Sequence, residues 1–104
     1  MRFEFDWDPA KAESNRAKHW VSFEEAMPVF RDPLGLSRPD DGHGANEERW
    51  VTLGQGAEGR LVLVVHTYVE IDVDRVTIRI ISARRPTRRE TRQYQEGAPH
   101  EGRI

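Results

Sequence analysis

Arginines gather in one segment near the C-terminus of the chain. Between positions 75 and 92 there are seven arginines and one acid, Glu90, although the formal net charge of the whole chain is −2. The planar guanidinium group of arginine binds a phosphate or carboxylate through two parallel hydrogen bonds, which the ammonium group of lysine cannot do. A near-neutral chain that concentrates these groups in one segment is predicted to bind an anion there.

Arg79 is predicted to lie in the middle of a strand. Side chains alternate along residues 75–85, which places Val76, Ile78 and Ile80 on one face and Thr77, Arg79 and Ile81 on the other. A guanidinium group in that position must reach solvent or meet an anion, because burying it unpaired is prohibitive. The anion is either a bound phosphate or a carboxylate on a neighbouring strand. The carboxylates that the sequence offers are Glu4, Asp6 and Glu70.

More arginines surround the start of the last predicted helix, residues 88–96. Arg84 and Arg85 come just before it, and Thr87 with Glu90 has the spacing of a capping box. The free N–H groups and the dipole of a helix N-terminus favour anions, so we expect Arg84 to bind phosphate. The helix adds further cations and an aromatic residue: Arg88, Arg89, Arg92 and Tyr94. A solvated basic surface is the alternative for these helix arginines.

His66 is the histidine best placed for proton transfer. It ends the aliphatic run LVLVV, so it projects from a central strand near the edge of the core. The alternative is a core histidine that is hydrogen-bonded to a neighbour. His19, with Lys18 beside it, ends the first predicted helix, where the helix dipole is the favoured reason for a cation. The histidines lack zinc spacing and the acids around His43 are loosely arranged, so we predict no metal and no cofactor.

Length and composition predict one small domain. A chain of 104 residues buries roughly 65% of its unfolded surface. We expect residues 1–96 to form the domain and residues 97–104 to be a flexible tail. The chain has no cysteine, which excludes disulfides and thiolate sites. Its longest aliphatic run, residues 61–65, is far shorter than the roughly 20 residues that span a bilayer, and the N-terminus is unlike a signal peptide. We therefore predict a cytoplasmic protein.

The hydrophobic pattern predicts a two-layer α+β domain with a mostly antiparallel sheet. The expected strands are residues 3–7, a short one at 34–38, and 49–55, 60–69 and 75–83. The expected helices are residues 9–20, 22–32 and 88–96, collected on one face of the sheet. Asp8 is expected to cap the first helix, and Ser22 with Glu25 has the spacing of a capping box at the start of the second. Pro28 lies inside the second helix and should kink or shorten it. Residues 39–46 are turn and breaker residues throughout, and so predict a loop.

The chain resembles the BrnT family of bacterial type II toxins. The matching segments are FEFDWDPAKAESNRAKHWVSFEEA, ERWVTLG, LVLVVHTY and IRIISARRPTRRETRQY, which together cover most of residues 3–96. The resemblance implies a RelE-like fold, ribonuclease activity that arrests translation, and a BrnA-like ribbon-helix-helix antitoxin that forms an operator-binding complex with the toxin. Two features depart from the family pattern: Pro28, and the acidity of TYVEIDVDRV, which alters the surface offered to a partner.

RNA cleavage without a metal uses the 2′-OH of the substrate as nucleophile on the adjacent phosphate. It needs a proton acceptor, a cation for the charge that builds on the phosphate, and a proton for the leaving 5′-oxygen. We expect Arg79 and Arg84 to hold the phosphate, His66 to carry the proton, and Tyr94 to assist or to stack on a base. The residues expected to bind RNA outside this centre are Arg85, Arg88, Arg92, Lys18 and His19.

Two functions without catalysis compete with this hypothesis. The basic segment from Arg84 to Arg92 could bind nucleic acid phosphates for recognition only. It could also bind an acidic partner protein. The sequence contains no helix-turn-helix pattern, and a net charge of −2 disfavours a protein that only binds nucleic acid.

Overall fold

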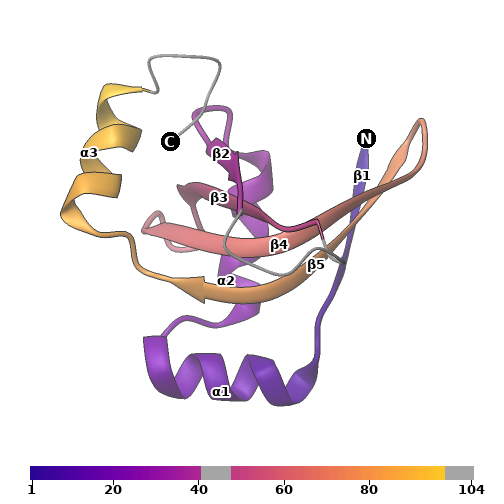
Figure 1. Cartoon of the computed structure of the whole chain (residues 1–104), viewed down its shortest axis with the longest axis horizontal. Helices are drawn as coiled ribbons and strands as arrows, with labels where there is room; N and C mark the ends of the chain where they lie inside the picture. The colour runs from indigo at the N-terminus through magenta and orange to yellow at the C-terminus, as the bar shows by residue number, and fades with distance from the viewer. Residues whose placement is uncertain (41–47, 98–104) are drawn as a thin grey trace.

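The computed structural model describes residues 1–40 and 48–97, which contain one five-stranded sheet (Figure 1). Its strands are β1 (Arg2–Asp6), β2 (Leu36–Pro39), β3 (Trp50–Gln55), β4 (Leu61–Asp72) and β5 (Arg75–Arg84). Their order across the sheet is β1-β5-β4-β3-β2. β1 runs parallel to β5, and the other neighbours are antiparallel. The predicted α+β class with a mostly antiparallel sheet is confirmed.

The helices begin at the capping residues that the sequence predicts. They are α1 (Pro9–His19), α2 (Phe23–Ala26), the 3-10 helix η1 (Met27–Arg31) and α3 (Arg88–Glu96). The Asp8 carboxylate accepts the Ala10 amide at 2.9 Å at the start of α1, and the Ser22 hydroxyl accepts the Glu25 amide at 3.0 Å at the start of α2. Both hydrogen bonds of the predicted capping box are present at α3.

Pro28 divides the second predicted helix, as expected. The α-helical hydrogen bonds stop at Ala26, and the chain continues to Arg31 as a 3-10 helix with Pro28 in its first turn. Proline has no N–H to donate to the preceding turn, so it is tolerated only where the helix starts afresh. The path of η1 brings Phe30 and Asp32 over β3 and β4, where both contribute to a cleft described below.

Each face of the sheet carries its own hydrophobic cluster, because the strands alternate. The N-terminal helices cover a cluster that includes Phe23, Val64 and Ile78. On the other face, Val51, Leu53 and Leu63 pack with Tyr94 of α3. The expectation that all helices share one face therefore fails for α3. The chain leaves β5 at its end and returns across the opposite side, as Figure 1 shows at the left.

Asn15 joins α1 to the sheet. Its side-chain nitrogen donates to the carbonyls of Val21 at 3.0 Å and Ala83 at 2.8 Å, and its oxygen accepts the Ala83 amide at 3.1 Å. These bonds satisfy a buried amide completely and set the position of α1 along β5.

No helix in the described residues is long and apolar enough to cross a membrane.

β4 is longer than predicted, because it continues to Asp72 before a turn at residues 73–74. Most of the predicted loop at residues 39–46, including His43, lies outside the described residues, as does nearly all of the predicted tail.

Candidate functional site

The face of the sheet that packs against α3 carries several arginines. Directly paired strand residues point to the same face, so pairing assigns each side chain to a side. Leu63 and Val51 belong to the cluster beneath Tyr94. Leu63 pairs with Arg84, and Val51 pairs with Arg38. Arg84 and Arg38 therefore share this surface, which we call the α3 face.

Arg79 also points to the α3 face. It pairs with Thr67, which lies two residues beyond Val65, and Val65 packs against the cluster of this face. A register shift between β4 and β5 decides the relation to Arg84: Ser82 pairs with Val65, whereas the next pair is Ile80 with His66. The extra residue, Ile81, is a β-bulge that reverses the alternation. Without it, residues 79 and 84 would lie on opposite faces.

Arg79 forms an ion pair with Asp6, its neighbour on β1. The Arg79 side chain is 45% exposed, so the pair lies in solvent and contributes little to stability. The sequence predicts either a bound phosphate or a carboxylate on a neighbouring strand as the partner of Arg79, and Asp6 is such a carboxylate. The pair leaves the remaining guanidinium hydrogens of Arg79 available to an anion that approaches from solvent.

Arg84 is held by Glu90 through two hydrogen bonds, of 2.8 and 3.0 Å. Glu90 also accepts the Thr87 amide at 2.8 Å, so one carboxylate both caps α3 and orients the arginine. The hydrogen bonds from Arg84 lower the pKa of Glu90 to about 2, and the bond to Glu90 raises the pKa of Arg84. Arg84 is thus a permanently charged group in a fixed orientation at the start of the helix.

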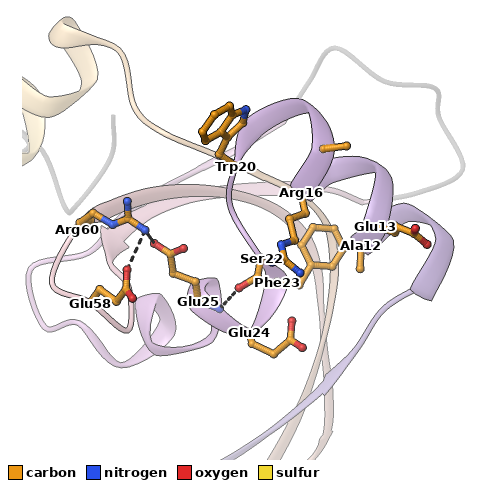
Figure 2. A pocket seen from close by; sticks show the side chains of 11 residues that line it. Ala12, Glu13, Arg16, Trp20, Ser22, Phe23, Glu24, Glu25, Glu58 and Arg60 are labelled. Carbon is orange, nitrogen blue, oxygen red and sulfur yellow. Dashed lines mark hydrogen bonds and ion pairs between the residues drawn. The ribbon is translucent and has the colours of Figure 1, made fainter.

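Arg85 points elsewhere. It donates to Glu25 at 2.8 Å and to the Leu61 carbonyl at 3.0 Å. Glu25 lines a hollow under α1, shown in Figure 2, where it also accepts from Arg60 at 2.8 Å. Arg60 reaches Glu58 at 2.9 Å as well. This placement indicates that Arg85 holds the hairpin between β3 and β4 against α2.

The remaining predicted RNA contacts are exposed. The side chains of Arg88, Arg89 and Arg92 form no hydrogen bond or ion pair with the described residues. Lys18 and His19 are exposed at the end of α1, on the helix that covers the other face of the sheet. The helix arginines are therefore charged groups free to meet an anion, and the two α1 residues are not close partners of Arg79.

Tyr94 reaches over the sheet edge to Asp32. Its hydroxyl donates to Asp32 Oδ2 at 2.6 Å. Partial burial and this hydrogen bond raise the pKa of Tyr94 to about 12, so the phenol keeps its proton at neutral pH. Burial alone would raise the pKa of Asp32, but hydrogen bonds from Tyr94 and two backbone amides lower it on balance. Tyr94 is therefore unable to act as a base near neutral pH.

His66 faces the opposite side of the sheet from Arg79. It pairs with Ile80 of the N-terminal cluster, and its ring meets the ring of Phe30 edge-on, with centroids 4.7 Å apart. It borders a cleft of about 380 Å³ with walls that include Trp50 and Tyr68. The structure brings Arg79, Arg84 and Tyr94 to one face and does not bring His66 to them.

Burial holds His66 in its neutral form, and its hydrogen bonds fix which ring nitrogen carries the proton. Nδ1 lies 3.1 Å from the Thr67 carbonyl, which can only accept, so Nδ1 carries the proton. Nε2 accepts from the Thr52 hydroxyl at 2.7 Å, which in turn lies 2.9 Å from the Ser37 hydroxyl. Burial lowers the pKa of His66 to about 4, a shift that the Thr67 carbonyl only partly opposes. His66 is therefore a core histidine that is hydrogen-bonded to its neighbours, which is the alternative to a proton carrier.

Two residues of the α3 face were not among the predicted site residues. The sequence indicates Asp6 only as a possible partner of Arg79, and it gives no reason to place Arg38 at the site. Alternation along β1 placed Asp6 opposite the aromatic side chains, but no local signal pairs β1 with β5. Arg38 belongs to a four-residue edge strand, whose facing depends on its register with β3.

The fold and the α3 face together define a small α+β domain with a cationic surface made by a sheet and a capped helix. Residues 7–90 match the sequence model of a family described as "Ribonuclease toxin, BrnT, of type II toxin-antitoxin system". The chain belongs to this family of ribonuclease toxins, which implies an RNA substrate and an antitoxin partner.

A solved structure supports the fold. The 1.1 Å crystal structure of the Brucella abortus ribonuclease toxin BrnT matches with a TM-score of 0.58. The match covers 84% of this chain and 100% of that chain, at 18% sequence identity. A comparison with curated protein sequences found no match.

Proposed function

We propose that the chain cleaves RNA on its α3 face without a metal, by attack of a ribose 2′-OH on the neighbouring phosphate. The observation that carries this proposal is the placement of Arg79 and Arg84 on one face of the sheet, the face against which α3 packs. A strand and a capped helix N-terminus are rigid supports, and cations stabilise a transition state strongly only when they are held in place beforehand.

The reaction requires three contributions from this face. Arg79 and Arg84 bind the phosphate oxygens, whose charge increases as the 2′-oxygen bonds to phosphorus and the bond to the 5′-oxygen breaks. Water supplies the proton for the leaving 5′-oxygen, so the products are a 2′,3′-cyclic phosphate and a 5′-hydroxyl. The Asp6 carboxylate, which contacts Arg79, is placed to accept the 2′-OH proton. Tyr94, protonated at neutral pH, serves as a stacking surface or a hydrogen-bond donor rather than a base.

His66 was our candidate proton carrier, and we now propose that it stabilises the sheet instead. Its side chain lies on the other face, and both ring nitrogens are engaged by Thr52 and Thr67. A group with a pKa of about 4 is a weak proton acceptor at neutral pH. Replacing His66 with glutamine should therefore reduce the cleavage rate less than about tenfold, provided the variant is folded.

The free cations of α3 extend the binding surface. Arg88 and Arg92 lie four residues apart on the helix, so they share one exposed side and can follow an RNA backbone. We further propose that cleavage arrests translation in the cytoplasm. We also propose that the antitoxin is a ribbon-helix-helix protein whose complex with this chain binds operator DNA.

The test uses purified chain, freed from antitoxin, and an end-labelled RNA in excess EDTA. Arg79→Ala and Arg84→Ala should each lower the cleavage rate by about 10²–10³-fold, as expected for loss of a preorganised donor. Arg75→Ala is the matched control, because Arg75 lies on the same strand and also pairs with carboxylates, Asp72 and Glu4. It should change the rate less than about threefold.

Three outcomes decide the proposal. Scission that leaves a 2′,3′-cyclic phosphate and is lost only in the two α3-face variants supports it. Scission that stops in EDTA rejects the metal-independent chemistry. RNA that binds with a steep salt dependence but stays intact favours a protein that only binds nucleic acid.

A further inference from the structure

The hairpin of β4 and β5 extends beyond the rest of the sheet. Pairing of β3 with β4 ends at Trp50 and His66, so no described strand pairs with the outer edge of β4 from Tyr68 to Asp72. In Figure 1 the hairpin tip lies at the right of the molecule, and α3 lies at the left. We call residues 68–74 the hairpin overhang.

The hairpin overhang exposes aliphatic side chains. Val69, Ile71 and Val73 are 51%, 49% and 86% exposed. Tyr68 is also exposed, and its hydroxyl lies 3.9 Å from the sulfur of Met1, which is exposed too. Aliphatic residues along an open strand edge form a template for another strand, and an isolated protein normally protects such an edge. This edge therefore has the character of a binding surface.

The charge of the hairpin overhang restricts its partner. It contains three acids, Glu70, Asp72 and Asp74, and no cation. Arg75 follows directly and pairs with Asp72 at 2.9 Å, which leaves the overhang and Arg75 together with an excess of two negative charges. RNA would be repelled here. A second copy of the chain would bring two acidic edges together, which is unfavourable as well.

We infer that the hairpin overhang binds an extended, cationic segment of the antitoxin, which adds as a strand to the open edge of β4. Main-chain hydrogen bonds to this edge supply affinity, and exposed aliphatic and acidic side chains select alternating apolar and basic residues. The inference rests on the proposed function in one respect only: it requires that the chain has an antitoxin.

The test uses the antitoxin co-expressed from the neighbouring gene and purified. The double variant Val69→Lys/Ile71→Lys removes the aliphatic surface and adds repulsion, and should weaken binding by about a hundredfold. The double variant Glu70→Lys/Asp74→Lys should weaken it by about tenfold or more. Leu34→Lys is the matched control, because Leu34 is an exposed aliphatic residue, 67% exposed, outside the overhang. It should change affinity less than about threefold.

Hydrogen exchange shows whether the antitoxin binds at the outer edge of β4. In the complex, the amides of residues 68–72 that point away from β5 should become protected. Both overhang variants should stay folded and able to cleave RNA, and should lose inhibition by the antitoxin. Equal affinity of the double variants and the wild type would overturn the inference. So would protection on α3 instead, or concentration-dependent protection of residues 68–72 in the chain alone, which would mean self-association. A wild-type chain that binds antitoxin but never cleaves RNA would reject the proposed function and leave this inference standing.

Discussion

The protonation of His66 can be tested through the dependence of stability on pH. His66 is buried, and burial lowers its pKa from an ordinary value of 6.5 to about 4. The folded state therefore disfavours the charged form that the unfolded state adopts below pH 6.5. The stability that this neutral histidine contributes is complete above pH 6.5 and is lost as the pH falls towards 4.

The size of the effect follows from the two pKa values. A difference between 6.5 and about 4, at about 1.4 kcal/mol for each pKa unit, gives roughly 3 kcal/mol of stability lost on acidification. Carboxylates also titrate in this range, so wild type should be compared with His66→Gln. Glutamine does not titrate, and the difference between the two proteins isolates the histidine.

Two measurements check this expectation. Urea unfolding should show that the advantage of wild type over His66→Gln decreases between about pH 7 and pH 4, and an NMR titration should place the pKa of His66 well below 6. A measured pKa near 6.5, with a stability difference that does not depend on pH, would refute the argument from burial and hydrogen bonding. It would remove the pKa argument against His66 as a proton carrier and leave only its position on the other face of the sheet.

Three further predictions concern stability and can be checked by urea unfolding. Asn15→Ala should cost about 2–4 kcal/mol, because it leaves buried main-chain groups of Ala83 without partners, and a cost below about 1 kcal/mol would contradict this. Trp20→Gly should stabilise the chain by about 0.5–1 kcal/mol, because Trp20 ends α1 at φ 60°, where glycine is unstrained; a loss of stability would mean that the indole makes a contact of value. Glu25→Gln should cost about 1–3 kcal/mol through its two arginine partners, whereas exposed Glu24→Gln, the matched control, should change stability by less than about 0.5 kcal/mol.

The local elements could be predicted because their signals are short-range. The capping residues Asp8, Ser22 and Thr87 fixed the starts of three helices, and Pro28 divided the second. Each acts through hydrogen bonds to amides two or three residues away, which the sequence displays directly. The strands followed from alternation for the same reason, although β4 ran past its predicted end because the hairpin continues into an acidic turn.

By itself, the sequence determined the helix starts, the strand pattern, the family resemblance and the concentration of arginines around the last helix. Only the tertiary structure decided which of these side chains share a surface. The bulge at Ile81 reverses the alternation of β5, and so places Arg84 on the same face as Arg79. Strand pairing places His66 on the other face, and burial against Phe30 keeps its ring neutral. The face on which a side chain lies depends on strand register, and its pKa depends on packing. Both arise from contacts between segments distant in the chain, which no local pattern encodes.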